Sequence, residues 1–162
     1  MRCFGTLDDL NNWGRPKYMV GEVDTYKKFP DYDLYGEFNV NYVKLDRVPG
    51  FDDWSAIHRA LRAGEFFVTT GEVLIPRWSV DGRGGQREVV AEVEWTFPLE
   101  LVEVVWGDGE KVGRKVISAT DQPPFRSHRF RIPIDAAGKK WVRFSAWDSA
   151  GNGAFTQPLH FR

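Results

Sequence analysis

The three histidines are the side chains best suited to hold a catalytic metal ion, and they are spread along the sequence. They are His58, His128 and His160. None of them shows the His-x-His or His-x-x-x-His spacing that brings two imidazoles to one ion. We therefore expect no complete metal centre within the chain, and we interpret each histidine as a surface or interface residue.

Motifs for nucleophiles, phosphate and calcium are equally sparse. Cys3 is the only cysteine, so no intrachain disulfide can form, and no Gly-x-Ser-x-Gly motif occurs. The glycine-rich stretch 82–85 is not followed by a helical pattern that would present N–H groups to a phosphate, so we interpret it as a hairpin turn. The stretch 148–153 carries oxygen-bearing side chains but too few carboxylates for a dedicated calcium site, which favours a tight turn.

The seven tryptophans suggest a different chemistry, because exposed aromatic rings on a β-sheet can stack on sugar rings. Trp106, Trp141 and Trp147 are the candidates for such ligand stacking. Trp141 and Trp147 have the same strand parity as Arg143 and Ser145, which predicts that they lie on the more solvated face. The alternative is that these rings pack in the core or at a domain interface.

The composition is that of a soluble globular protein. Hydrophobic residues make up 42% of the sequence and charged residues 28%, with a formal net charge of -1. A balanced charge does not favour nucleic acid as a partner. The sequence has no apolar run long enough for a membrane span and no apolar stretch near residue 1 typical of a signal peptide.

From residue 72 onward, short alternating stretches are separated by turn residues. Apolar residues occupy every second position in three stretches, 89–97, 130–134 and 142–146. Turn residues lie between the expected strands, at 81–85, 107–109, 138 and 149–153. Roughly seven strands at this spacing predict an immunoglobulin-like β-sandwich over residues 72–162, with Val93 and Phe144 facing its core.

Residues 1–71 show a different pattern, and we expect a mixed, partly irregular segment. Apolar spacing, a preceding aspartate and Gly64 predict a short helix at about 53–63. Two further stretches, 17–20 and 40–45, could be strands. The many aromatic residues without periodicity predict a segment that packs on something else, either the sandwich or another domain, or that mediates self-association.

Several stretches resemble one family of enzymes. They are 18–24, 35–46, 60–75, which contains Ala63-Gly64-Glu65-Phe66-Phe67-Val68-Thr69-Thr70-Gly71, and 141–158. In order and spacing these are similar to the C-terminal part of CehA/McbA-type metallohydrolases, relatives of the PHP (polymerase and histidinol phosphatase) superfamily. The resemblance implies a barrel that holds divalent metals and hydrolyses ester-, carbamate- or phosphoester-type bonds, followed by a β-sandwich.

The sequence also departs from that family. The His-x-His motif and the other early metal histidines belong to the barrel N-terminal to this region, and they are not present here. The resemblance places only Asp24 at a metal-ligand position, and one carboxylate does not activate water as a multi-ligand site does. We therefore expect no cofactor in this chain, and a divalent metal only together with an upstream barrel.

Two functional hypotheses follow. In the first, the chain is the non-catalytic C-terminal region of a PHP-like hydrolase, in which residues 1–71 are the tail of the barrel-like domain. It would then have a packing, interaction or substrate-gating role, with the barrel as its partner. In the second, it is a free-standing β-sandwich module that binds a carbohydrate or a protein.

Overall fold

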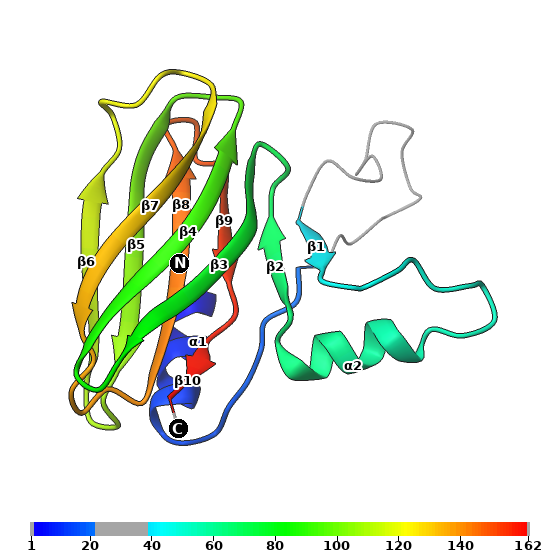
Figure 1. Ribbon diagram of the computed structural model, residues 1–162, viewed down its shortest axis with the longest axis horizontal. Helices are drawn as coiled ribbons and strands as arrows, with labels where there is room; N and C mark the ends of the chain where they lie inside the picture. Colours follow the sequence, from blue (N-terminus) through cyan, green and yellow to red (C-terminus); the bar gives the residue numbers. More distant parts are fainter. Residues whose placement is uncertain (1, 22–38, 162) are drawn as a thin grey trace.

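The computed structural model of the protein describes residues 2–21 and 39–161, with side chains from residue 4 onward (Figure 1). Two helices are present in these ranges, α1 (Arg2–Asn12) and α2 (Ser55–Ala63). The strands are β1 (Val40–Val43), β2 (Phe66–Thr69), β3 (Val73–Arg83), β4 (Gln86–Trp95), β5 (Leu99–Gly107), β6 (Val112–Ser118), β7 (Arg126–Asp135), β8 (Trp141–Asp148), β9 (Gly153–Thr156) and β10 (Leu159–His160). Neither of the described helices is long and apolar enough to cross a membrane.

The strands form two antiparallel sheets that pack face to face as a β-sandwich, which confirms the predicted mainly β fold class. The large sheet has the order β1-β2-β9-β8-β5-β6, and β10 also pairs with β8. The small sheet has the order β3-β4-β7. Because β3 packs over β9 and β4 over β8, strands β2 and β1 continue the large sheet beyond the small one (Figure 1).

Strand β4 shows how the sequence pattern produces the two layers. Val89, Ala91 and Val93 are at most 1% exposed and face the large sheet. On the opposite face of the strand, Glu88 and Glu92 point outward and form ion pairs with arginines of β7. The hairpin from β3 to β4 reverses at Gly84, whose φ of 64° is a conformation that glycine adopts without strain. The alternation predicted for this strand is therefore the alternation observed.

The core lies between the two sheets. Val93 and Phe144, which were predicted to face it, are both fully buried. Phe144 belongs to the central strand β8 of the large sheet, and its backbone N–H donates to Thr156 Oγ1 on β9 at 2.9 Å. Because these side chains fill the space between the layers, the sandwich core is the main source of hydrophobic stabilisation.

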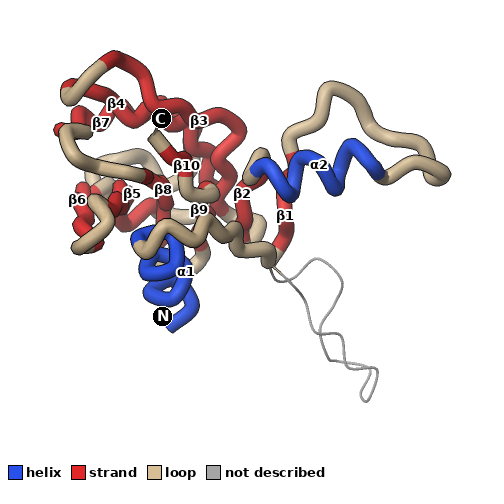
Figure 2. The backbone as a smooth tube through the Cα atoms, turned by 90° about the horizontal axis from the view of Figure 1, so that it is seen from below, coloured by secondary structure: helices blue, strands red, loops and turns tan. Residues whose placement is uncertain are grey.

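The outer face of the large sheet is covered by α1, which the sequence analysis did not predict. Figure 2 shows this helix lying below the sheet. Trp141, Arg143 and Ser145 are each at most 2% exposed, and Trp147 is half-buried. The prediction that this side of β8 is the more solvated face was therefore wrong, because strand parity identifies which residues share a face but not what covers that face.

The short predicted helix is present as α2. It begins at Ser55 rather than 53, and the Asp53 carboxylate accepts a hydrogen bond from the Ser55 N–H at 2.9 Å. Gly64 ends the helix in the left-handed conformation with φ of 73°, as predicted. Here the local signals of the sequence were sufficient.

The predicted boundary between residues 71 and 72 does not divide the hydrogen-bonded sheet. Strand β2, which precedes it, pairs with β9 with Val68 opposite Phe155. Of the two earlier strand candidates, 40–45 contains β1, whereas 17–20 is irregular. Strands from both sides of residue 71 thus build one sheet.

Candidate functional site

The three tryptophans proposed for ligand stacking do not share a face. Trp106 on β5 lies on the inner side of the large sheet and packs against the core. Its ring is approached by Lys139 Nζ at 5.1 Å from the centroid. Trp141 and Trp147 lie on the other side, beneath the N-terminal helix. Trp141 is fully buried, and Phe4 meets Trp147 edge-on at 5.9 Å. These rings therefore do not form a common stacking platform.

The histidines likewise lie on three separate elements. His58 is on α2, His128 is on β7 with its ring 4.8 Å from that of Phe130, and His160 is on β10. Asp24 lies outside the described residues. Within the described ranges, no group of three or more His, Cys, Asp or Glu side chains is placed to hold a metal ion.

The 148–153 loop is a tight turn organised by one carboxylate. Asp148 accepts hydrogen bonds from the N–H groups of Ala150 and Asn152 at 2.9 and 2.8 Å, and from the Asn152 side-chain amide at 3.0 Å. This confirms the interpretation of the stretch as a turn, because the carboxylate oxygens are directed at the loop's own backbone.

A buried ion pair fixes α1 on the large sheet. Asp8 accepts two hydrogen bonds from the Arg143 guanidinium, at 2.7 and 2.8 Å, and both side chains are at most 5% exposed. The guanidinium also lies over the Phe4 ring at 4.9 Å. A bidentate arginine–carboxylate pair of this geometry fixes orientation as well as energy. We assign it a structural role.

The C-terminal end of α1 is held by further polar contacts. Asn12 Oδ1 accepts a hydrogen bond from the Gly109 N–H at 2.8 Å, and Asn11 Oδ1 lies 2.9 Å from His160 Nε2. Partial burial lowers the pKa of His160 below its ordinary value of 6.5, because the charged imidazolium loses water contacts there. The helix thus connects the start of the chain to its last strand.

The two most exposed large apolar residues of the described ranges, Val48 and Phe51, lie on a segment that projects from the sandwich. We call residues 39–65 the arm; it comprises β1, the connecting loop and α2 (Figure 1). On its loop, Val48 is 91% exposed, Phe51 99% and Trp54 51%. Isolated exposed apolar residues are ordinary, but three within seven residues of sequence on a projecting loop make it a candidate interaction surface.

The tip of this loop has a defined conformation. Trp54 Nε1 donates to the Phe51 carbonyl oxygen at 3.0 Å, and the Asp53 N–H donates to the Gly50 carbonyl oxygen at 3.4 Å. The backbone hydrogen bond from Ser55 holds the pKa of Asp53 below its usual range, so this carboxylate stays ionised at neutral pH. The loop therefore presents Phe51 and Trp54 without needing a partner to order them.

An open groove of about 1180 Å³ runs beside β3. Its floor is the overhanging part of the large sheet, where the rings of Tyr42 and Phe67 stack at 5.1 Å. Its rim is charged. Hydrogen bonds from Arg129 lower the pKa of Glu92 on that rim, and Arg77 lies 3.8 Å from the same carboxylate. An apolar floor with a charged rim suits a protein or peptide ligand.

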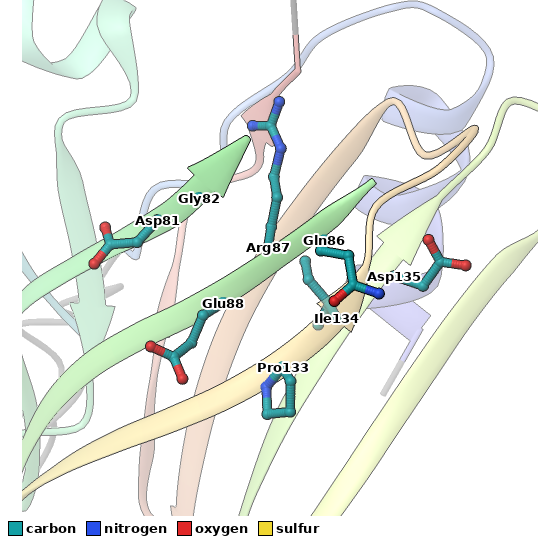
Figure 3. Close-up of a pocket in the computed structure, with 8 residues that line it drawn as sticks. All are labelled: Asp81, Gly82, Gln86, Arg87, Glu88, Pro133, Ile134 and Asp135. Carbon is teal, nitrogen blue, oxygen red and sulfur yellow. The ribbon is translucent and has the colours of Figure 1, made fainter. Parts of the chain in front are cut away.

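A second, shallower hollow of about 470 Å³ lies at the other end of the small sheet (Figure 3). Its carboxylates are already engaged: Glu88 with Arg131 at 2.6 Å, and Asp135 with the Ala137 N–H at 3.0 Å. Arg87 extends away from them and lies over the Phe161 ring. The polar groups do not converge on one point, so we assign no site to this hollow.

Comparisons with family models, curated proteins and solved structures found no match to this chain. The candidate site residues that were not predicted from the sequence are the exposed loop residues Val48 and Phe51. Their signal was present in the sequence, since Val48 and Phe51 are large apolar residues on either side of Pro49-Gly50, in a stretch whose composition is typical of a turn.

Proposed function

We propose that this chain is the non-catalytic β-sandwich region of a metal-dependent hydrolase of the CehA/McbA type, and that it binds the metal-binding barrel of that hydrolase through its arm. The observation that carries the proposal is the exposure of Val48, Phe51 and Trp54 on one ordered loop. The sequence resemblance supplies the identity of the partner.

The energetics of the loop support a docking role. Each aromatic side chain that becomes buried in an interface removes on the order of 150–250 Å² from water. A few such anchors dominate the binding energy of protein interfaces, and tryptophan is enriched among them. Because the loop is held by hydrogen bonds of Trp54 and Asp53, little conformational freedom is lost on binding.

The described residues do not fit a hydrolytic metal site. Such a site needs several imidazole and carboxylate ligands around one ion. His128 and His160 lie on different strands, and His58 lies on α2 in the arm. His160 is directed at Asn11 rather than at another ligand. The proposal therefore places the hydrolytic chemistry on the barrel and gives this chain a role in packing or substrate gating.

The reading frame upstream is the first test. We expect it, or an adjacent gene, to encode a barrel with a His-x-His motif. The isolated chain should hydrolyse neither p-nitrophenyl acetate nor bis(p-nitrophenyl) phosphate with zinc, manganese or iron added, whereas the barrel-containing protein should. A metal-dependent turnover by the isolated chain, abolished by a chelator, would contradict the proposal.

Docking through the arm is the second test. With barrel and sandwich produced separately, Phe51→Ser should weaken their association roughly 30-fold in a calorimetric titration, the effect expected for an interface anchor. The matched control is Phe125→Ser, because Phe125 is 73% exposed but lies on the loop before β7, outside the arm. Equal effects of the two substitutions would exclude the arm as the docking surface.

A further inference from the structure

The free edge of β3 offers unpaired backbone groups to the groove. Strand β3 pairs only with β4 among the described strands, in a register that runs from Arg83 opposite Gln86 to Arg77 opposite Glu92. Residues that flank a two-residue turn form a hydrogen-bonded pair, and such pairs alternate along an antiparallel ladder. The N–H and C=O groups of Trp78 and Val80 therefore point away from β4, toward the free edge.

Strand β7, on the other side of β4, supports this assignment. Pro133 lies opposite Glu88. A proline nitrogen cannot donate to a ladder, so position 133 must have its backbone nitrogen directed away from β4. Position 88 then pairs through hydrogen bonds with Asp81 of β3, and the same alternation leaves the backbone groups of Val80 on the open side.

The width of the part of the large sheet that extends beyond β3 favours an extended strand as the ligand. Neighbouring strands lie about 4.8 Å apart, so the two overhanging strands β2 and β1 provide a floor about 10 Å wide beside β3. One added strand, or two, would fit on this floor. A second copy of the sandwich would not fit beside β3, because its large sheet would occupy the same layer as β1 and β2 of the first copy.

The side chains along the edge define what the strand should carry. On the inner side, an added strand would meet Trp78 and, below it, the stacked Tyr42 and Phe67. On the outer side it would meet Arg77, whose side chain is 79% exposed, and Asp81. Among the described residues, Arg77 forms only a long ion pair, 3.8 Å from Glu92 Oε2, and its exposed side chain can turn toward an incoming carboxylate.

We propose that the β3 edge binds an extended peptide segment of a partner protein, which adds antiparallel to β3 as a fourth strand of the small sheet. Its alternate apolar side chains lie over Tyr42 and Phe67, an acidic side chain faces Arg77, and a basic side chain faces Asp81. Strand addition of this kind obtains affinity from main-chain hydrogen bonds and specificity from alternate side chains. The proposal is independent of the barrel partner, because it uses β3 rather than the apolar loop of the arm.

A designed peptide can test the site directly. The probe is a fluorescent nine-residue peptide, Thr-Val-Lys-Phe-Thr-Val-Glu-Phe-Thr, which in the antiparallel register with its central threonine opposite Ser79 places lysine opposite Asp81 and glutamate opposite Arg77. Binding is followed by fluorescence anisotropy. At saturation, hydrogen exchange should show new protection of the Trp78 and Val80 amides. The control peptide has lysine and glutamate exchanged, and we expect it to bind about tenfold more weakly, because like charges then oppose each other across the strands.

Two variants of the protein complete the test. Arg77→Glu should weaken binding of the first peptide about tenfold. The same variant should strengthen binding of the exchanged peptide, because the lysine of that peptide then faces a carboxylate at position 77. Val80→Pro should abolish binding, because it removes a donor from the free edge while leaving the β3–β4 ladder intact; Val80→Thr keeps the donor and is its control. No binding, equal binding of both peptides, or protection at another strand edge would overturn the proposal. Protection of the β3 amides that rises with protein concentration alone would identify a second copy as the occupant instead.

Discussion

The sandwich and the arm are parts of one hydrogen-bonded sheet, yet they differ in how many of their faces are covered. Strand β8 has the small sheet on one side and α1 on the other, and all its residues except Trp147 are buried. On the arm, Phe51 is 99% exposed and α2 has a single buried residue, Ala60. Secondary structure alone therefore does not indicate where the stability of this protein lies.

The difference in coverage between the sandwich and the arm has consequences for stability and for binding. Regions with few buried contacts open locally at low free energy, whereas a core strand opens only when the whole domain unfolds. Binding surfaces come from regions that keep apolar groups available to a partner, as the arm does. We expect the sandwich to set global stability and the arm to set association, and the following substitutions test that division.

The largest contrast should come from the same substitution in the two regions. Phe144→Ala removes a fully buried ring and should lower the free energy of unfolding by about 3–5 kcal/mol, because the core cannot close the cavity completely. Phe51→Ala in the arm should change it by less than about 0.5 kcal/mol. Urea unfolding followed by circular dichroism measures both. Similar losses for the two variants would show that the arm contributes to the cooperative core.

The next effect concerns the covering of the outer face by α1. Asp8→Ala leaves the Arg143 guanidinium buried without its carboxylate, and we expect a loss of about 3 kcal/mol in chemical unfolding. Asp9→Ala, the neighbouring exposed position, is the control and should be neutral within about 0.5 kcal/mol. A neutral Asp8→Ala variant would mean that the helix does not stabilise the sheet.

A smaller effect is expected on self-association of the isolated chain. The apolar arm should make its apparent mass rise with concentration in static light scattering. Phe51→Ser should weaken this association roughly tenfold, the size expected for one aromatic side chain at an interface, whereas Phe125→Ser should not. A chain that stays monomeric at all concentrations would argue against the arm as an apolar contact surface.

The smallest effect is a pH dependence from His160. Its pKa is lowered in the folded state by burial, so the unfolded state binds a proton first as the pH falls. The contribution of His160 to stability is present above 6.5, the ordinary pKa of histidine, and is lost as the pH falls from there through the lowered folded-state value. His160→Gln should flatten this part of the stability profile. An unchanged slope in thermal unfolding between about pH 5 and 7 would assign the pH dependence to other groups.

Several features could be predicted because their signals are local. The alternation of β4, the left-handed Gly64 after α2 and the Asp148 turn each depend on residues close together in sequence, and all three are observed. Helix α1 was missed, although Phe4, Leu7 and Leu10 recur at intervals of three. Its polar residues Asp8 and Asn11 contradict an apolar stripe, because their partners come from the sheet and the C-terminal strand rather than from the helix itself.

By itself, the sequence determined the fold class, the inward positions Val93 and Phe144, and the short helix before Gly64. Only the tertiary structure decided which sheet faces are covered and which are free. Alternation along β8 groups Trp141, Arg143 and Ser145 on one face, but the side chain that makes burial of Arg143 possible is Asp8, 135 residues earlier. The charge of Arg143 can be buried because a distant segment supplies its partner. That pairing is a property of the folded arrangement rather than of any local sequence pattern.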